Sequence, residues 1–214
     1  MRSASGSSVT RIELSLGGDQ TTYQNINNLG NDPNNVFYQN LASIQKQLNL
    51  DAINLDDEGT TTIGGGDYYM DVCQQIASWC ISNEIFVSIT PYVNQGFWEQ
   101  YVAAVNKSKS GTMDAVYLQC YGGADPGDWN KYLSPLTVVS GFDASTATPD
   151  EVQQELAGWS TIPMAGGFIF TGTSMVVGYG GNPPSHKPNG SPSQYAQAIV
   201  NGLKKAADAA SGMS

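Results

Sequence analysis

The stretch LDAINLDDE, at residues 50–58, places four carboxylates and an amide on one short apolar segment. In a β-strand side chains alternate between the two faces, so Asn54, Asp56 and Glu58 point the same way, with neighbours about 7 Å apart. Two carboxylates held close together should share a proton, which raises the pKa of one of them. A carboxyl group with a raised pKa is what general acid catalysis near neutral pH requires. We therefore predict that this row is catalytic.

The same acidic row could instead hold a metal ion, or be a structural or solvated acidic turn. A calcium loop needs a flexible turn, whereas Asn54 and Asp56 alternate with the apolar residues Ile53 and Leu55 as in a strand. We therefore predict no metal ion and no cofactor. The glycines at 64–66 follow the acidic row but match neither common phosphate-binding motif, which lowers the case for a nucleotide.

Charge and hydrophobic patterning exclude several partners. The 214 residues suit one globular domain. Asp plus Glu number 19 against 9 for Lys plus Arg, so the formal net charge is −10, which argues against nucleic acid and anionic membrane surfaces. The sequence contains no run of 18 apolar residues, so it predicts no membrane span.

Cys73 and Cys80 fall about 10 Å apart in a predicted helix, too far to form a disulfide.

Strand and helix patterns alternate along the chain. The strands are apolar on both faces, as in a parallel sheet, so the repeat predicts an α/β fold, either a (β/α) barrel or a doubly wound sheet. Thr148 and Glu151 form a capping-box pattern at the start of one helix. Strands are predicted over 11–18, 50–58, 85–93, 114–121, 135–143 and 165–172, and helices over 36–48, 67–82, 97–108, 127–133, 148–159 and 191–210.

Polar side chains gather where these strands end. The active site of a parallel βα protein lies at the carboxyl ends of its strands, so we predict that these residues converge. They are Ser15 with Gly17 and Gly18, Asp56 to Glu58, Thr90 and Tyr92, Gln119 and Tyr121, Asp143, Thr171 and Thr173.

The acidic row resembles the DGxDxDxE signature of family 18 glycoside hydrolases, the chitinases and endo-β-N-acetylglucosaminidases. Three other segments fall in the order of that family. LSLGG is similar to its SxGG motif, YLQCY to its sixth-strand motif and AGGFIFTG to its eighth-strand segment. The resemblance covers nearly the whole chain, from the third barrel strand to the last helix.

The resemblance implies substrate-assisted retaining hydrolysis of β-1,4-linked N-acetylglucosamine, in chitin or N-glycans. Glu58 would protonate the glycosidic oxygen, and the N-acetyl carbonyl of the substrate would attack the anomeric carbon. Asp56 would orient the acetamido group and stabilise the oxazolinium ion. Tyr121 would hydrogen-bond the acetamido oxygen, and Gln119 would contact the same sugar. The family also implies an oligo- or polysaccharide partner and an extracellular location.

Two residues depart from the family pattern. Asn54 stands where the family usually has an aspartate that shares a proton with the next one, so we expect slowed catalysis. Thr171 stands near the position of the tryptophan that usually floors the catalytic sugar. Phe168 and Phe170 could supply an aromatic wall only if the register differs.

The remaining predicted substrate-binding residues are Ser15, Asn54, Tyr92, Trp129 and Thr171. The four tryptophans lie in or beside helix patterns, which is typical of packing, and Trp129 is the best candidate for a sugar platform among them.

The chain shows six predicted strands where a barrel of this family has eight. We therefore expect residues 1–214 to form a single, incomplete barrel domain that lacks the first two strands. The chain could be a fragment, a true six-stranded form, or a barrel completed by a partner or by self-association. Two other functions stay open: a non-hydrolytic, lectin-like carbohydrate-binding protein, and a βα protein of other chemistry with a chance motif.

Overall fold

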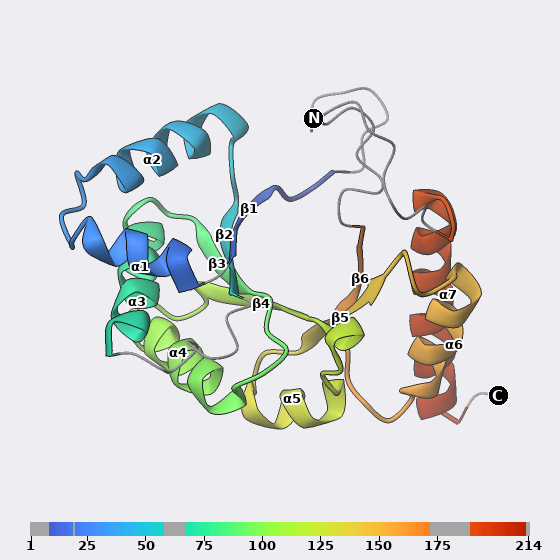
Figure 1. Ribbon diagram of the computed structural model, residues 1–214. Coiled ribbons are helices and arrows are strands. Elements are labelled where there is room, and N and C mark those ends of the chain that lie inside the picture. The colour runs from blue at the N-terminus through green and yellow to red at the C-terminus, as the bar shows by residue number, and fades with distance from the viewer. Residues whose placement is uncertain (1–8, 19, 58–66, 172–188, 213–214) are drawn as a thin grey trace. The chain divides into compact units, whose positions relative to one another are not determined.

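A computed structural model describes residues 9–18, 20–57, 67–171 and 189–212 (Figure 1). The chain divides into two compact units, Met1–Val116 and Tyr117–Ser214, and each is described by itself. Strand β4 (Met113–Leu118) runs across this division.

The first unit is a parallel sheet whose neighbouring strands follow the order of the chain. Its core lies between the sheet and its helices: Ile53 and Leu55 on one face of β2 are fully buried, as are Val72 and Ile76 on α3. This agrees with the prediction that Ile53 and Leu55 point away from the acidic row. The elements are β1 (Glu13–Gly18), α1 (Gln20–Asn28), α2 (Val36–Leu48), β2 (Ala52–Asp57), α3 (Asp67–Ser82), β3 (Phe86–Ile89) and α4 (Gln95–Ser108).

The second unit contains a parallel strand pair backed by two long helices, which Figure 1 shows side by side. Phe142 on the first strand of the pair packs with Val152, Leu156 and Tyr195 of these helices. The elements are the 3-10 turn η1 (Cys120–Gly122), α5 (Pro126–Tyr132), β5 (Val138–Asp143), α6 (Pro149–Gly158), β6 (Gly166–Phe170) and α7 (Pro192–Ala210).

These elements confirm the α/β class and are compatible with an incomplete β/α barrel. The helices predicted over 36–48 and 67–82 begin and end at those residues. The predicted capping box of Thr148 and Glu151 is present. Cys73, Cys80 and Cys120 are free thiols, as expected for the first two, and burial raises the pKa of the Cys80 thiol to about 12.

Helix α1 was not predicted, because its sequence QTTYQNINN is mostly polar. Tyr23 and Ile26, one turn apart, are almost fully buried and anchor the helix. The Tyr23 hydroxyl donates to the Leu16 carbonyl at 2.9 Å, and its ring lies 5.0 Å from that of Tyr69 on α3. Tertiary packing of two residues therefore overrides a weak helical pattern.

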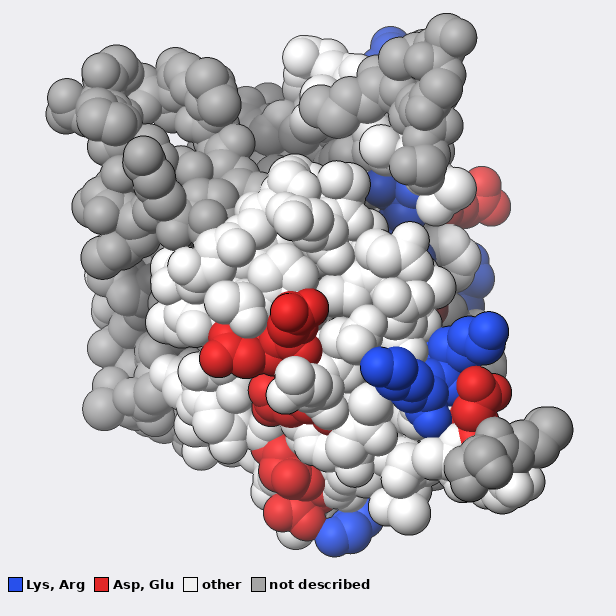
Figure 2. All heavy atoms as spheres, turned by 90° about the vertical axis from the view of Figure 1, so that its right-hand side faces the viewer, with Lys and Arg blue, Asp and Glu red and all other residues white. Residues whose placement is uncertain are grey.

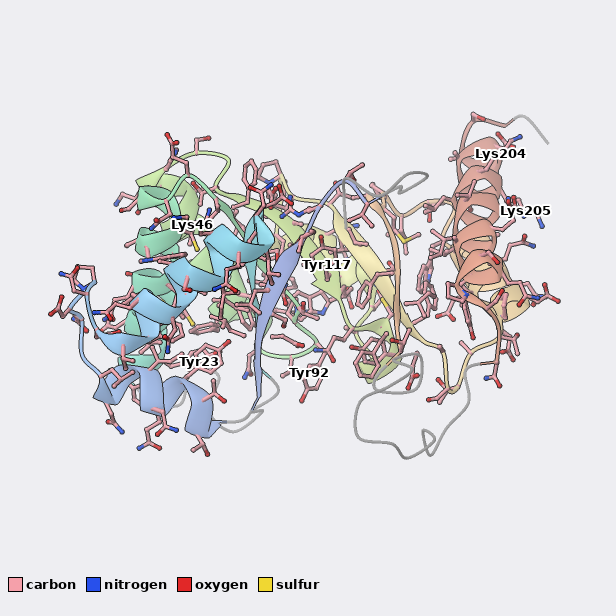
Figure 3. The ribbon with its side chains drawn as sticks, turned by 90° about the horizontal axis from the view of Figure 1, so that it is seen from above. Tyr23, Lys46, Tyr92, Tyr117, Lys204 and Lys205 are labelled. Atoms are coloured by element: carbon pink, nitrogen blue, oxygen red, sulfur yellow. The ribbon has the colours of Figure 1, made fainter. Side chains whose placement is uncertain are left out.

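The outer face of α6 and α7 carries only scattered charges. Figure 2 shows small groups of acidic and basic side chains on a mainly uncharged surface, and Lys204 and Lys205 extend from α7 in Figure 3. Within the described part of the chain, no helix combines the length and apolar character needed to cross a bilayer.

The close contact of α6 and α7 depends on Gly202, and this supports a stability prediction. A Cβ at Gly202 would lie 2.7 Å from the Leu156 Cβ and 2.9 Å from the Gln153 carbonyl oxygen, so the helices would have to separate. We expect Gly202→Ala to lower the free energy of unfolding by about 1–3 kcal/mol in urea titrations.

The matched control is Gly158→Ala at the end of α6, where a Cβ would meet no atom within 4 Å. Alanine favours the helix there, so we expect stability to stay unchanged or to rise by up to about 1 kcal/mol. Equal effects of the two substitutions would contradict the packing argument.

Candidate functional site

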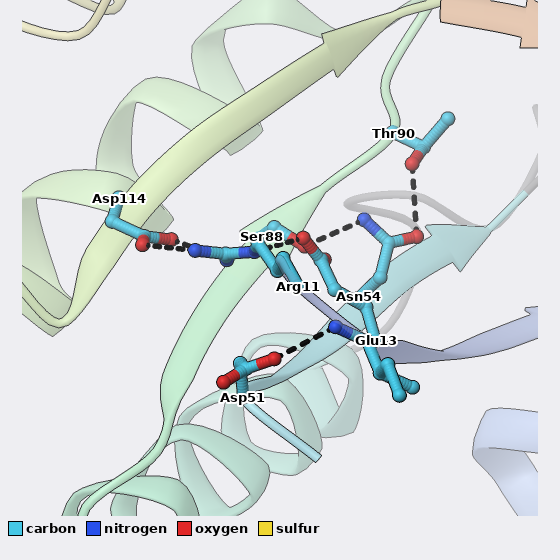
Figure 4. Close-up of polar contacts among 8 residues, drawn as sticks. Arg11, Glu13, Asp51, Asn54, Ser88, Thr90 and Asp114 are labelled. Atoms are coloured by element: carbon cyan, nitrogen blue, oxygen red, sulfur yellow. Dashed lines mark hydrogen bonds and ion pairs between the residues drawn. The ribbon is translucent and has the colours of Figure 1, made fainter. Parts of the chain in front are cut away.

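Asn54 lies at the centre of a hydrogen-bonded cluster on the first unit's sheet. Its Oδ1 accepts hydrogen bonds from the Ser15 hydroxyl at 3.1 Å and the Thr90 hydroxyl at 2.9 Å. Its Nδ2 donates to the Ser88 hydroxyl at 2.9 Å (Figure 4). The parallel register produces this cluster, since Asn54 pairs with Ser15 on β1 and with Ser88 on β3. The amide is only 6% exposed, so these contacts fix its orientation.

Asp56 lies next along the same face of β2, towards the carboxyl end of the strand. It pairs with Gly17 on β1, and a Cβ added at Gly17 would lie 3.8 Å from the Asp56 Oδ2. The half-buried carboxylate therefore lies against bare backbone. The predicted SxGG and acidic motifs thus meet residue by residue across two neighbouring strands.

A second charged cluster, which none of the sequence motifs includes, lies at the amino end of the same face. The Arg11 guanidinium donates to both Asp114 oxygens, at 2.6 and 2.8 Å, and to Glu13 (Figure 4). Hydrogen bonding to Asp114 raises the pKa of Arg11 above its ordinary value. The Ser88 hydroxyl also donates to Glu13, which joins this cluster to Asn54. The alternation of Arg11, Glu13 and Ser15 in RIELS is the signal that could have predicted it.

In the second unit, aromatic side chains cover one face of β6. The Tyr121 and Phe170 rings stack with centroids 5.2 Å apart, and Phe168 contacts Tyr117 edge to face at 5.7 Å (Figure 3 labels Tyr117). Ile169, between the two phenylalanines, packs instead with the cluster of α6 and α7. Phe168 and Phe170 therefore share one aromatic face of β6 with Tyr117 and Tyr121, and their role as an aromatic wall for a sugar stays a prediction.

Gly141 makes room for this aromatic face. It pairs with Phe168 across β5 and β6, and a Cβ on Gly141 would lie 2.3 Å from the Phe168 Cζ. Phe170 is 44% exposed, and Thr171, the predicted substrate-binding residue, follows it directly after the strand ends. The exposed ring in this segment is therefore Phe170, one residue before the position at which an aromatic floor was expected.

Other predicted site residues differ in their exposure. Tyr92 is half-buried in the segment that follows β3 (Figure 3). Gln119 is 4% exposed and Trp129 is 1% exposed. The indole of Trp129 is thus a packing group in this structure, and burial leaves it no free face for a sugar. Glu58 lies outside the described residues, as do Thr173 and the glycines at 64–66.

Each unit brings together part of the predicted set. The first unit joins Ser15, Asn54, Asp56 and Thr90, and the Thr90 hydroxyl donates to Asn54. The second unit joins Tyr121 to the phenylalanines of β6. The first set offers a carboxylate, an amide and hydroxyls to polar groups of a ligand, and the second offers aromatic faces. Among the described residues, no group of three His, Cys, Asp or Glu side chains could hold a metal ion.

No known family model matches this chain, and no curated protein matches it either.

Proposed function

We propose that this protein is a glycoside hydrolase of the family 18 type that cleaves β-1,4-linked N-acetylglucosamine. The observation that carries the proposal is the register of β1 and β2. It brings Ser15 to Asn54 and Gly17 to Asp56, so two motifs that are 39 residues apart in the chain meet at one site. A chance match of the acidic motif alone would not require this pairing.

In the proposed reaction the substrate supplies its own nucleophile, so the protein needs one acid/base group and a group that stabilises positive charge. Glu58 is the acid/base. Asp56 orients the acetamido group and stabilises the oxazolinium ion, and Tyr121 donates to the acetamido oxygen. Asn54 cannot take up charge from Asp56, so we expect slower turnover than an aspartate at this position would give.

The proposed partner is an oligo- or polysaccharide that contains N-acetylglucosamine, in chitin or an N-glycan. The β-1,4-linked N-acetylglucosamine units are uncharged, so the net charge of −10 on the protein does not oppose their binding. By the same family resemblance we propose an extracellular location.

A second candidate is a carbohydrate-binding protein that does not hydrolyse its ligand. Two observations favour it: position 54 is a neutral amide with fixed hydrogen bonds, and Phe170 exposes an aromatic ring beside Tyr121. Aromatic faces and amide groups suffice to bind a sugar without any chemistry.

Binding of a thiazoline analogue of N-acetylglucosamine tests the proposed function, because this compound mimics the bicyclic oxazolinium ion. We expect calorimetry to give an affinity at least about 100-fold higher than for N-acetylglucosamine itself. Asp56→Asn should abolish this preference because it removes the charge that stabilises the ion.

Asp208→Asn, on the exposed face of α7, is the matched control and should leave both affinities unchanged. Equal affinity of the unaltered protein for the two ligands would exclude the substrate-assisted mechanism. Binding of chitin oligomers without a preference for the thiazoline would favour the second candidate.

A further inference from the structure

A continuous chain of hydrogen bonds crosses the first unit's sheet from its amino end to Asn54 (Figure 4). Asp114 at the start of β4 accepts from Arg11, and Arg11 donates through Nε to Oε1 of Glu13. Oε2 of Glu13 accepts from the Ser88 hydroxyl, and Ser88 accepts from Nδ2 of Asn54. Glu13 lies on β1 and Ser88 on β3, and position 52 on β2 between them carries only the methyl group of Ala52.

The series of hydrogen bonds runs in one donor-to-acceptor direction, because a hydroxyl has only one hydrogen to donate. Ser88 uses its hydrogen on Glu13, so it offers only lone pairs to residue 54. An amide at position 54 can donate to those lone pairs, but an ionised carboxylate cannot. Since Ser88 is fully buried, a mismatch there would leave a polar group without a partner.

We propose that Glu13 is a positioning residue that acts through Ser88 to orient the Asn54 amide and makes position 54 select an amide over a carboxylate. Arg11 binds one oxygen of Glu13 and so fixes the orientation in which the other oxygen faces Ser88. With Nδ2 held by Ser88, Oδ1 of Asn54 faces the hydroxyls of Ser15 and Thr90. The consequence for turnover rests on the proposed function, whereas the selection at position 54 does not.

Replacing Glu13 by Gln should reverse the donor-to-acceptor direction of the hydrogen bonds that run through Ser88. Arg11 is a donor, so the Gln carbonyl must face it, and the Gln amide then faces Ser88. Ser88 accepts from that amide and turns its own hydrogen towards residue 54. Nδ2 of Asn54 now meets a donor where it needs an acceptor, and turning the amide over would take Oδ1 away from the Ser15 and Thr90 hydroxyls that donate to it. An aspartate at position 54 would be satisfied by donors on both sides. Asn54→Asp should therefore rescue Glu13→Gln.

Urea unfolding of the two single variants and the double variant at neutral pH tests this selection. We expect each single substitution to lower the folding equilibrium constant roughly tenfold to hundredfold, because each leaves one buried hydrogen bond mismatched. The double variant should regain most of that loss. Independent effects that simply multiply in the double variant would overturn the proposal.

Charge repulsion between Glu13 and the carboxylate introduced by Asn54→Asp could also produce a rescue. Measuring the same two single variants and their double variant in a Ser88→Ala background separates the two causes. Alanine removes the hydroxyl but leaves both charges in place. We expect the rescue to vanish in that background. A rescue that persists without the hydroxyl would assign the coupling to repulsion and overturn the role of Ser88.

Side-chain amide NMR gives a second reading that does not require the Ser88→Ala proteins to fold. We expect Glu13→Gln to shift the Asn54 NH2 signals, because the amide loses its acceptor. The Asn35 NH2, which donates to the Gly30 carbonyl at 2.9 Å, is the matched control and should not move. Unchanged Asn54 signals would overturn the proposal.

Kinetics on a fluorogenic chitobioside then show whether the orientation of Asn54 affects catalysis. We expect Glu13→Gln to lower kcat about tenfold with KM within about twofold, as for a group that acts only on the transition state. Asn54→Asp should restore kcat in that variant. If the unaltered protein is inactive but the unfolding cycle shows the rescue, the proposed function fails while the role of Glu13 stands.

Discussion

Replacing Glu58 by Gln should reduce kcat for a fluorogenic chitobioside by about 100- to 10,000-fold. Glutamine has almost the same size but no proton to give to the glycosidic oxygen, so the leaving group must depart unprotonated. KM should change little, because the amide keeps the shape and hydrogen-bonding reach of the side chain. Such a split, with kcat lost and KM kept, identifies a group that acts in the transition state.

The matched control is Glu99→Gln on the exposed side of α4, which should leave kcat and KM unchanged. Hydrolysis that survives Glu58→Gln would show that another group acts as the acid. A folded protein that binds chitin oligomers but hydrolyses none of them would shift the assignment to the carbohydrate-binding candidate. The assay therefore separates the two candidate functions.

The sequence predicted those helices and strands in which the spacing of apolar residues matches the face that packs against the core. Val36 to Leu48 carries apolar residues at helical intervals, and Asn35 before it caps the helix by accepting from two backbone amides. Helix α1 lacks that pattern, because two side chains anchor it and the other seven are polar. A helix held by so few contacts leaves little periodic signal in its own sequence.

The sequence predicted that polar residues from several strands gather at one edge of the sheet, but it did not predict which of them contact one another. Alternation along β2 correctly separated the row of Asn54 and Asp56 from the buried Ile53 and Leu55. It could not predict that Thr90 donates to Asn54, because that contact depends on the register between strands. Likewise, the position of Trp129 after a strand did not indicate its burial, which packing within the second unit decides.

The ion pair of Arg11 and Asp114 joins residues that are 103 positions apart, and no local pattern predicts it. The pair holds the start of β1 to the start of β4. Its removal should therefore lower the free energy of unfolding. The guanidinium side chain is 29% exposed and the Asp114 side chain 24% exposed. Arg11 also contacts Glu13, so its loss would leave two half-buried carboxylates without their counter-ion.

We expect Arg11→Leu to lower the free energy of unfolding by about 2 kcal/mol at pH 7, less than the full penalty for breaking a buried pair because both partners are partly solvated. Arg11→Lys keeps the charge but loses the two-pronged contact, so its effect should be intermediate. Urea titrations provide the measurement. Lys131→Ala, which breaks the exposed pair with Asp128, is the control and should cause no measurable change.

The loss in Arg11→Leu should come from charge rather than from packing. Hydrogen bonding to Asp114 raises the pKa of Arg11, so its positive charge is present throughout the accessible pH range. Salt screens the attraction between partly exposed charges, so the difference in stability between Arg11→Leu and the unaltered protein should shrink when the urea titrations are repeated at about 1 M salt. A loss that stays constant as the salt concentration rises would show that Arg11 stabilises the sheet by packing on Phe86, whose ring centroid lies 5.5 Å from it, rather than by its charge.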